Sequence, residues 1–317
     1  MVDYRKVCYL FITIIGIPVN LLAIVILCRG KCGLSKCITR YLVAMAGADL
    51  MVVIIEVLLY QIIESYGKLS VLGDAPFCLV HYSLCHVASD CSVWFTVAFT
   101  FDRFVTICWS AMKVKYCTPK IASVVIGTIG IGLCLKNIPF YFLYMETSAF
   151  RVGDKWFCFG KPALPMTDTL DGFYWVDRVF NPLLPFFLIL FLNTLTVRMI
   201  LAASKVRRTL KGQGNREKQL DPELKSRRQS IVLLFTLSAS FLVCWATTTL
   251  VFILTRCLYT DLETSIRLFQ AQDAGTVMQL FSCCTNTFIY GITQTKFREQ
   301  VRIAMLYPVN LLFSFLK

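Results

Sequence analysis

The stretch VWFTVAFTFDRFVTIC (residues 93–108) decides the fold of this chain. It ends a long apolar run, and its Asp102-Arg103 charge pair stands where a membrane helix would meet the cytoplasm. A helix needs about 20 apolar residues to cross roughly 30 Å of hydrocarbon. The chain has enough such stretches to predict seven spans, at about 7–28, 41–63, 77–108, 121–144, 174–203, 230–254 and 268–292. The seventh is the weakest, because polar residues such as Gln272 and Asp273 interrupt it.

Composition also indicates a membrane protein. Apolar residues make up 57% of the 317 residues, and the mean hydropathy is +0.66, which is well above the average of soluble proteins. The polar stretches are short enough to be loops, so we expect one domain over residues 1–317. The predicted fold is an all-α membrane protein, a seven-transmembrane helix bundle. A short amphipathic eighth helix is predicted at about 295–306, with Phe297 and Ile303 on its apolar face and Arg298 on its charged face.

The basic residues predict the orientation of the bundle, because Lys and Arg in short loops stay on the cytoplasmic side. Segments on one side hold 22 of the 32 basic residues but 5 of the 19 acidic ones, a net charge of +17; they are 29–40, 102–120, 198–230 and 293–317. That side is predicted to be cytoplasmic, which places the amino terminus outside. The excess charge favours contact with anionic membrane lipids. Nucleic-acid binding is not expected, because the charge is spread over four loops.

Position decides which of the 15 cysteines are candidates for pairing. Cys78, at the outer start of the third span, and Cys158, in the long outer loop, both face the oxidising side. We predict a disulfide between them, which would hold this loop over the bundle. A zinc site is not expected, because the two histidines, His81 and His86, lie five residues apart and so about 140° apart around a helix.

Ionisable residues inside the predicted spans are the sharpest functional signal, because a charge at the bilayer centre costs about 2.5–3.5 kcal/mol or more. Asp49 is the clearest, and a polar cluster around it is expected to include Asn20, Ser92, Ser282 and Asn286. Oxygen ligands of this kind suit a small cation such as an allosteric sodium ion. The alternative is a plain hydrogen-bond network that joins the helices. We expect no other metal and no cofactor.

Motifs in six of the spans carry a resemblance to a known family. They are Gly16-Ile17-Pro18-Val19-Asn20, Ala48-Asp49-Leu50, Asp102-Arg103-Phe104, Pro185, Cys244-Trp245 and Asn286-Thr287-Phe288-Ile289-Tyr290, followed by Lys296-Phe297-Arg298. In this order and spacing they resemble the rhodopsin-like (class A) G-protein-coupled receptors over essentially the whole chain. Within that family, RGKCGLSKC (29–37), TRYLVAM (39–45) and QTKFRE (294–299) look like the orphan receptors 139 and 142.

The resemblance implies a multi-pass receptor of the plasma membrane that activates a heterotrimeric G protein at its cytoplasmic face. The subgroup implies a small extracellular ligand, an aromatic amino acid such as tryptophan or phenylalanine, and coupling through the Gq class. The alternatives are a receptor-fold scaffold or scavenger with weak or no signalling, and a receptor for a peptide. A transporter, a retinal protein and an intramembrane protease fit less well, because internal repeats, a lysine in the seventh span and a catalytic motif are not found. The chain is therefore not expected to be an enzyme.

The resemblance also implies an activation switch. Its expected residues are Asp102, Arg103, Val93, Pro185, Phe241, Trp245 and Tyr290. In the family's inactive state Arg103 pairs with Asp102. The usual second restraint is an acidic residue at the inner end of helix six, but that end reads KSRR (225–228) here. A basic end cannot hold Arg103, so we expect measurable basal signalling. Three positions depart from the family pattern, with Thr247 and Thr287 in place of prolines and Asn193 in place of a tyrosine.

We selected the candidate ligand residues by their depth in the predicted membrane and by the helix face on which they lie. They are Glu56, Tyr82, Cys85, His86, Ser89, Trp245, Phe252, Arg256 and Asp273. Cys85 stands where amine receptors of this family have an aspartate, which argues against a biogenic amine. An amino acid needs a partner for its carboxylate, for which Arg256 and Arg178 are candidates. It also needs a partner for its ammonium group, either Glu56 or Asp273. For Glu56 and for Asp90, a role in the pocket and a simple polar contact remain open.

Overall fold

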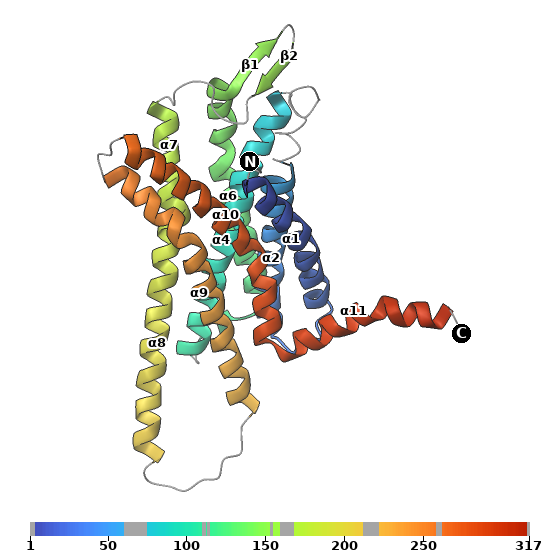
Figure 1. Ribbon diagram of the computed structural model, residues 1–317. Helices are drawn as coiled ribbons and strands as arrows, with labels where there is room; N and C mark the ends of the chain where they lie inside the picture. The colour runs from blue at the N-terminus through green and yellow to red at the C-terminus, as the bar shows by residue number, and fades with distance from the viewer. Residues whose placement is uncertain are drawn as a thin grey trace.

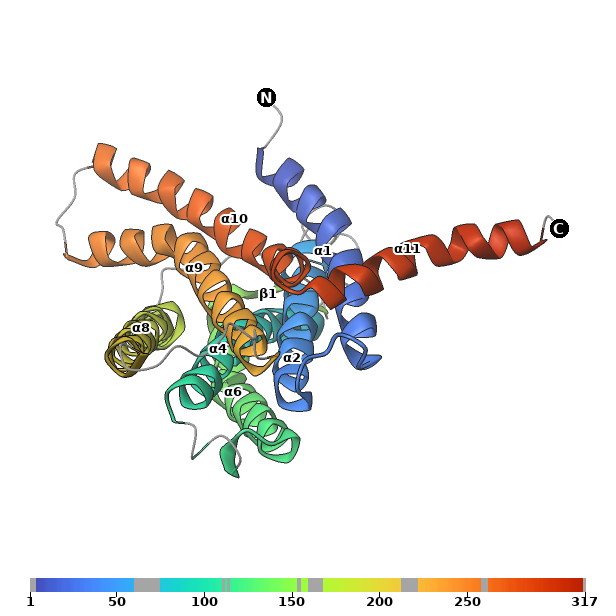
Figure 2. The ribbon, with the colours of Figure 1, turned by 90° about the horizontal axis from the view of Figure 1, so that it is seen from below.

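The computed structural model describes residues 4–59, 75–109, 112, 115–152, 155–158, 168–211, 222–257 and 262–315. Side chains are described for residues 4–59, 77, 79–109, 112, 115–142, 172–205, 228–255 and 267–306. Long helices dominate this part of the chain and pack side by side as a bundle (Figures 1 and 2). The predicted helical architecture is therefore confirmed in outline.

The first half of the bundle comprises α1 (Tyr4–Cys28), α2 (Lys36–Val52) with its π-helical continuation η1 (Val53–Leu59), α4 (Ala75–Cys108) and α6 (Pro119–Ser148). The second half comprises α7 (Asp168–Arg178), the π-helical segment η4 (Val179–Leu183), α8 (Leu184–Lys211), α9 (Pro222–Cys257) and α10 (Leu262–Thr293). The last helix, α11 (Thr295–Phe315), projects sideways from the end of α10 (Figure 1). It contains the predicted eighth helix and extends beyond it, and positions 60–63 of the predicted second span lie outside the described residues.

Six helical segments of the described chain are long and apolar enough to cross a membrane. They are Tyr4–Cys28, Lys36–Leu59, Leu79–Cys108, Pro119–Phe142, Gly172–Lys205 and Arg228–Thr255. Helix α10 is not one of them, in keeping with the polar residues that weaken the seventh predicted span. The outward faces of these segments are apolar; Val124, Ile131 and Leu135 of α6, for example, are each at least 60% exposed. Such surfaces suit contact with lipid rather than with water.

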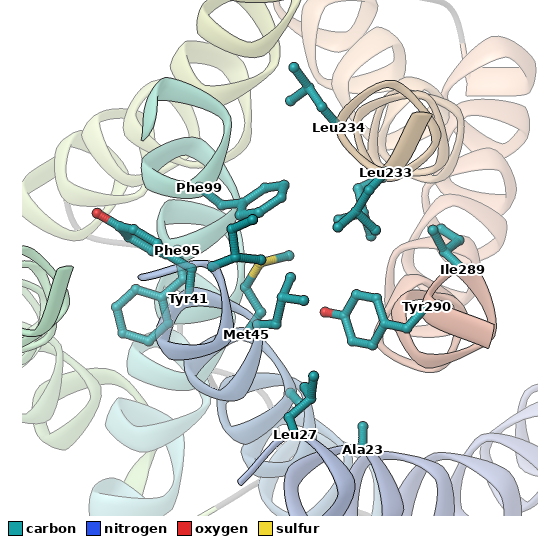
Figure 3. Packing of buried hydrophobic residues seen from close by; sticks show 14 of the residues in the cluster. Ala23, Leu27, Tyr41, Met45, Phe95, Phe99, Leu233, Leu234, Ile289 and Tyr290 are labelled. Atoms are coloured by element: carbon teal, nitrogen blue, oxygen red, sulfur yellow. The ribbon is translucent and has the colours of Figure 1, made fainter. Parts of the chain in front are cut away.

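The main hydrophobic core lies where α1, α2, α4, α9 and α10 meet at the end of the bundle near α11 (Figure 3). Tyr41 and Met45 of α2 pack there with Phe99 of α4, Leu233 of α9 and Tyr290 of α10. All five side chains are almost completely buried. This packing holds together the helices that carry the polar sites described below.

A tight turn joins α1 to α2 and is shaped by glycine. Gly30 and Gly33 have φ angles of +69° and +68°, which side chains other than glycine rarely adopt. Ser35 then caps α2, because its hydroxyl accepts a hydrogen bond from the backbone N–H of Ile38 at 3.3 Å. The side chain of Lys296 lies against Gly33, so the turn also contacts the first residues of α11.

A short hairpin extends the bundle at the end opposite to α11 (Figure 1). Strand β1 (Ala149–Val152) pairs antiparallel with β2 (Lys155–Cys158), and β2 lies against α4. The sequence analysis did not anticipate these strands. The side chains of Cys78 and Cys158 lie outside the described part of the chain, so the disulfide between them stays a prediction.

Two helices change their winding beside the centre of the bundle. In η1 the π-helical turn carries Glu56, and the backbone carbonyl of Ile55 contacts His81 Nε2 of α4 at 2.7 Å. In η4 the backbone of Asn181 leaves the helical region, with φ −149° and ψ 110°, just before Pro182. Irregular turns of this kind re-aim side chains and often occur at functional sites.

Helices α9 and α10 approach closely at Gly275, which generates a stability prediction. A Cβ added there would lie 2.8 Å from Thr248 Oγ1 and 3.0 Å from the Thr248 backbone nitrogen. We expect Gly275→Ala to lower stability by roughly 1–3 kcal/mol, because backbone atoms must move apart. Thermal unfolding of the purified protein measures the effect. Gly291→Ala is the matched control, since no atom lies within 4 Å of its added Cβ; equal midpoints for the two variants would contradict the close approach.

Candidate functional site

A cavity of about 130 Å³ lies at the centre of the bundle. Residues of η1, α4, α7, η4, α9 and α10 line it: Glu56, Cys85, His86, Ser89, Asp90, Asp177, Arg178, Asn181, Trp245 and Gln279. Five of the predicted ligand residues are among them, namely Glu56, Cys85, His86, Ser89 and Trp245. The cavity therefore brings together charges of both signs and one large aromatic ring.

Glu56 and Arg178 provide the opposite charges that face this space. The hydroxyl of Ser89 donates a hydrogen bond to Glu56 Oε2 at 3.0 Å and so orients the carboxylate. Within the described part of the chain, no hydrogen bond or ion pair engages the guanidinium of Arg178. Of the two arginines considered from the sequence, Arg178 lines the cavity, whereas the side chain of Arg256 lies outside the described residues.

A buried ion cluster lies against the cavity and joins α4, α6 and α7. Lys136 Nζ of α6 lies 2.7 Å from Asp90 Oδ2 and 2.5 Å from Asp177 Oδ1. Asp90 also accepts hydrogen bonds from the side-chain amides of Asn137 and Asn181, each at 2.7 Å. Asp90 is 1% exposed, so these donors replace the water that the carboxylate has lost.

The sequence analysis named Asp90 but missed its partners. Lys136 was detectable as a lone basic residue inside the apolar run 121–144, where an ionisable group marks a functional site by default. Nothing in the sequence pairs it with Asp90 and Asp177, because the partners lie 46 and 41 residues away in the chain.

His86 connects this cluster to the aromatic wall. Its Nδ1 lies 3.5 Å from Asp177 Oδ2, and its ring stacks on Phe140 with a centroid distance of 4.2 Å. Phe140 in turn packs with Leu79, Tyr82 and neighbouring tyrosines. Tyr82 thus belongs to this aromatic layer and is not one of the lining residues.

Two other predicted ligand residues lie elsewhere. Phe252 packs edge-on against Trp175, with ring centroids 5.3 Å apart. Asp273 forms an ion pair with Arg5 of α1 at 3.4 Å, and both groups are partly exposed. Of the two candidate ammonium partners, Glu56 therefore faces the cavity and Asp273 does not.

The predicted polar network is centred on Asp49, which is 1% exposed. Ser92 donates to Asp49 Oδ1 at 2.5 Å, and the Asn286 amide donates to Oδ2 at 2.7 Å. Asn20 instead donates to the backbone carbonyls of Gly16 and Cys283, each at 2.9 Å. Ser282 bonds to the carbonyl of Gln279 on its own helix at 2.6 Å. The structure thus joins α2, α4 and α10 through Asp49, and Asn20 ties α1 to α10 beside it.

An aromatic stack lies below the cavity. Trp245 stacks on Phe241 one turn earlier in α9, with ring centroids 5.3 Å apart. Val93 and Val97 of α4 and Ile189 of α8 complete this buried cluster. Pro185 is buried one turn before Ile189, and Ile189 supplies the α8 side of the packing. Because Trp245 lines the cavity and also belongs to this cluster, a ligand that displaces it must disturb the packing of α9 on α4.

The charge pair Asp102–Arg103 lies buried at the other end of α4. Arg103 Nε donates to Asp102 Oδ2 at 3.1 Å, its terminal nitrogen also donates to this oxygen, and its guanidinium lies over the Phe99 ring at 5.8 Å. The Cys37 thiol of α2 donates to Asp102 Oδ1 at 3.4 Å. Each oxygen of the carboxylate is therefore engaged.

Two further residues support this end of the bundle. Burial raises the pKa of the Cys117 thiol above its usual value, and the carboxylate of Asp102 adds to the effect. The thiol therefore stays protonated at neutral pH, where its sulfur contacts Thr106 Oγ1 at 2.8 Å. Tyr290 is fully buried in the main core and packs edge-on against Phe297 of α11.

A comparison with protein families covers most of the chain. The model of the 7 transmembrane receptor (rhodopsin family) matches residues 19–290. The chain belongs to this family. The receptor is therefore a multi-pass membrane protein, and its family signals through G proteins in response to extracellular ligands. The resemblance inferred from the motifs is confirmed at this level.

The single restraint on Arg103 generates a prediction about basal signalling. The segment 225–228 contains no acidic residue, so Asp102 is the carboxylate that holds Arg103 in the described part of the receptor. We expect basal G-protein activation above that of mock-transfected cells. Asp102→Asn is expected to raise it further by weakening the ion pair, and Arg103→Ala to abolish it. G-protein dissociation at matched surface expression measures all three; basal output equal to mock cells would contradict the prediction.

Proposed function

We propose that the receptor binds a small extracellular amino acid in the central cavity and activates a heterotrimeric G protein of the Gq class. In this proposal Arg178 binds the ligand carboxylate, Glu56 binds the ammonium group, and the side chain lies toward Trp245. An aromatic amino acid such as tryptophan or phenylalanine is the proposed ligand, as in the orphan receptors 139 and 142 that the sequence resembles.

The observation that carries this proposal is that opposite charges line one cavity, with Asp90 and Asp177 paired to Lys136 and with Glu56 and Arg178 left for a ligand. A zwitterion presents both charges within a few ångströms, and such a site matches it. Charged hydrogen bonds of this type contribute about 1.5–3 kcal/mol each. A cavity of about 130 Å³ is also below the range of roughly 300–1,000 Å³ that is common for drug-sized ligands. Its size favours a small ligand over a peptide.

The proposed topology places the amino terminus and the hairpin outside, in the plasma membrane, with seven spans and α11 along the inner surface. The disulfide between Cys78 and Cys158 would then hold β2 close to α4 above the cavity. At the inner face, release of Arg103 from Asp102 would open a docking site for the G protein.

Signal transmission is proposed to start at Trp245. A ligand that pushes this ring disturbs its stack with Phe241 and the contacts of that stack with Val93 and Ile189. Packed clusters of this kind have discrete arrangements, so a small displacement becomes a movement of the whole helix. A receptor fold that only scaffolds or scavenges would not need Arg103, so the experiment below separates the two functions.

The test is calcium release and G-protein dissociation in cells that express the receptor, with tryptophan and phenylalanine titrated. We expect a saturable response that Arg103→Ala abolishes. Glu56→Gln and Arg178→Gln should each raise the EC50 roughly 10- to 100-fold, because each removes one charged contact. Asp273→Asn is the matched control, since it removes a carboxylate that pairs with Arg5 away from the cavity. Silence at confirmed surface expression, or equal losses in all three variants, would refute the proposed site.

We further propose that Asp49 binds a sodium ion that stabilises the inactive receptor. Asp49 and Ser92 supply oxygen atoms from two helices, in line with the preference of sodium for oxygen ligands, and the Asn286 amide N–H donates to the same carboxylate from a third helix. Replacing potassium by sodium in the assay buffer should lower the agonist affinity of the wild-type receptor. The agonist affinity of the Asp49→Asn variant should be the same in both salts. Radioligand competition in the two salts measures this. An equal effect of sodium on both proteins would identify the cluster as a plain hydrogen-bond network.

A further inference from the structure

The ion cluster of Lys136, Asp90 and Asp177 lies against the cavity. None of its three residues belongs to the family motifs quoted from the sequence. Lys136 is the cation that both Asp90 and Asp177 contact, and it reaches them from α6. Asp90 follows Ser89, whose hydroxyl orients Glu56. Asp177 precedes Arg178. One lysine therefore pairs with the two wall carboxylates whose neighbours in the chain are Ser89, which orients Glu56, and Arg178.

Charge balance is the second observation. The cavity wall carries three carboxylates, those of Glu56, Asp90 and Asp177, and one guanidinium, that of Arg178. With the carboxylates ionised and His86, which also lines the cavity, neutral, the wall has a formal charge of −2, and Lys136 beside it brings the sum to −1. In that state the cavity keeps an excess negative charge even with its lysine in place.

The amide of Asn181 adds a third observation. Its nitrogen donates to Asp90 Oδ1 at 2.7 Å, which fixes the orientation of the amide. Its oxygen, in a side chain that is 7% exposed, has no hydrogen-bond partner among the described residues. A buried acceptor on the wall of a cavity calls for a donor. Acceptors and excess negative charge together suit a ligand with an ammonium group.

We propose that Lys136 is a positioning and specificity-determining residue: it sets the charge of the cavity so that a ligand must carry an ammonium group but is allowed to carry a carboxylate. Without Lys136 the two carboxylates that it neutralises repel an anionic group. The cavity then favours a simple amine over the amino acid. This inference rests on the proposed function for the identity of the ligand, and its first test below does not need a ligand.

A purely structural role is the alternative, because Lys136 also ties three helices together. Removing one member of a buried ion pair destabilises a protein in either case. The two roles differ in the electrostatic potential of the cavity. If Lys136 has only a structural role, its variants should be less stable, but cationic and anionic probes should react in the same proportion as in the wild-type receptor.

The native thiol of Cys85 reports this potential, since Cys85 is a partly exposed lining residue. Receptor in lipid nanodiscs is treated with a cationic or an anionic methanethiosulfonate, the trimethylammonium-ethyl or the sulfonato-ethyl reagent. Mass spectrometry of the peptide that contains Cys85 gives the two rates, and Cys85→Ser identifies the contribution of Cys91. Both reagents attack the same thiolate, so the ratio of their rates cancels its reactivity and reports the local charge.

We expect the cationic reagent to react faster in the wild-type receptor. Lys136→Met should raise the ratio at least about tenfold, because one positive charge near the cavity is lost. Lys136→Arg should keep the ratio, and Asp177→Asn should lower it. Lys120→Met is the matched control, a lysine 16 residues earlier in the same helix and therefore about 24 Å away. If Lys136→Met does not fold, the double variant Lys136→Met with Asp177→Asn removes one charge of each sign, and its ratio should exceed that of Asp177→Asn alone by at least about tenfold. Ratios within twofold of wild type in a folded Lys136→Met, or within twofold of each other in the double variant and Asp177→Asn, would overturn the proposal.

A second measurement connects the charge to ligand choice. Lys136→Met should raise the EC50 of tryptophan relative to that of tryptamine, which lacks the carboxylate, by about tenfold or more. Lys136→Arg should restore the wild-type preference. If the wild-type receptor responds to neither tryptophan nor tryptamine, the proposed ligand is refuted. The ratio of the two reagent rates at Cys85 still tests the role of Lys136 in that case. A response to both compounds with an unchanged preference in Lys136→Met refutes the specificity role alone.

Discussion

The cost of burying a carboxylate is the constraint on which this structure depends. Asp49, Asp90 and Asp102 are each 1% exposed. An uncompensated charge in such a place costs several kcal/mol, so each needs donors. Each carboxylate has at least one donor from another helix: Ser92 and Asn286 for Asp49, Lys136 and two amides for Asp90, and Cys37 for Asp102, which is also paired with Arg103 of its own helix. The contacts that pack these helices together thus also supply donors to the buried carboxylates.

Helix α4 carries a residue of each of these sites. Asp90, Ser92 and Asp102 lie within 12 residues of one helix, a length of about 18 Å. The cavity, the proposed sodium site and the charge pair therefore share one rigid element. A ligand in the cavity, as proposed, would contact the same helix that carries Arg103. The helix is therefore a direct connection between the cavity and the charge pair at the other end of the bundle.

The sequence predicted the parts of the site that depend on regular helices. Asp102 and Arg103 are neighbours in the chain, and Phe241 and Trp245 lie one turn apart, so their contacts follow from helix geometry. The pairing of Asp49 with Ser92 and Asn286 followed from comparable depth in three spans.

Part of what the sequence did not predict depends on an irregular turn. Asn181 lines the cavity from a break in the helical backbone, and a regular helical projection does not contain such a break. Glu56 was predicted although it lies on a π-helical turn. Phe252 and Asp273 were placed with the ligand, and Asp177 was left out, because the sequence alone does not show which face of α9, α10 or α7 is turned toward the cavity. Lys136 was missed for a different reason, since its partners come from distant helices and only the packed bundle brings them together.

Movement of α9 must take a particular form, because Pro222 at its first position is the only proline in the helix and Thr247 replaces the proline of the family. Proline kinks ease helix bending, so under the proposed mechanism a push on Trp245 would move α9 without the hinge that an internal proline supplies. Two contacts would couple this movement to α10. Thr248 lies against Gly275, and Ser240 contacts Thr285 at 3.0 Å. Because α10 also carries Asn286 and Tyr290, the proposed movement would reach both Asp49 and the main core through α10.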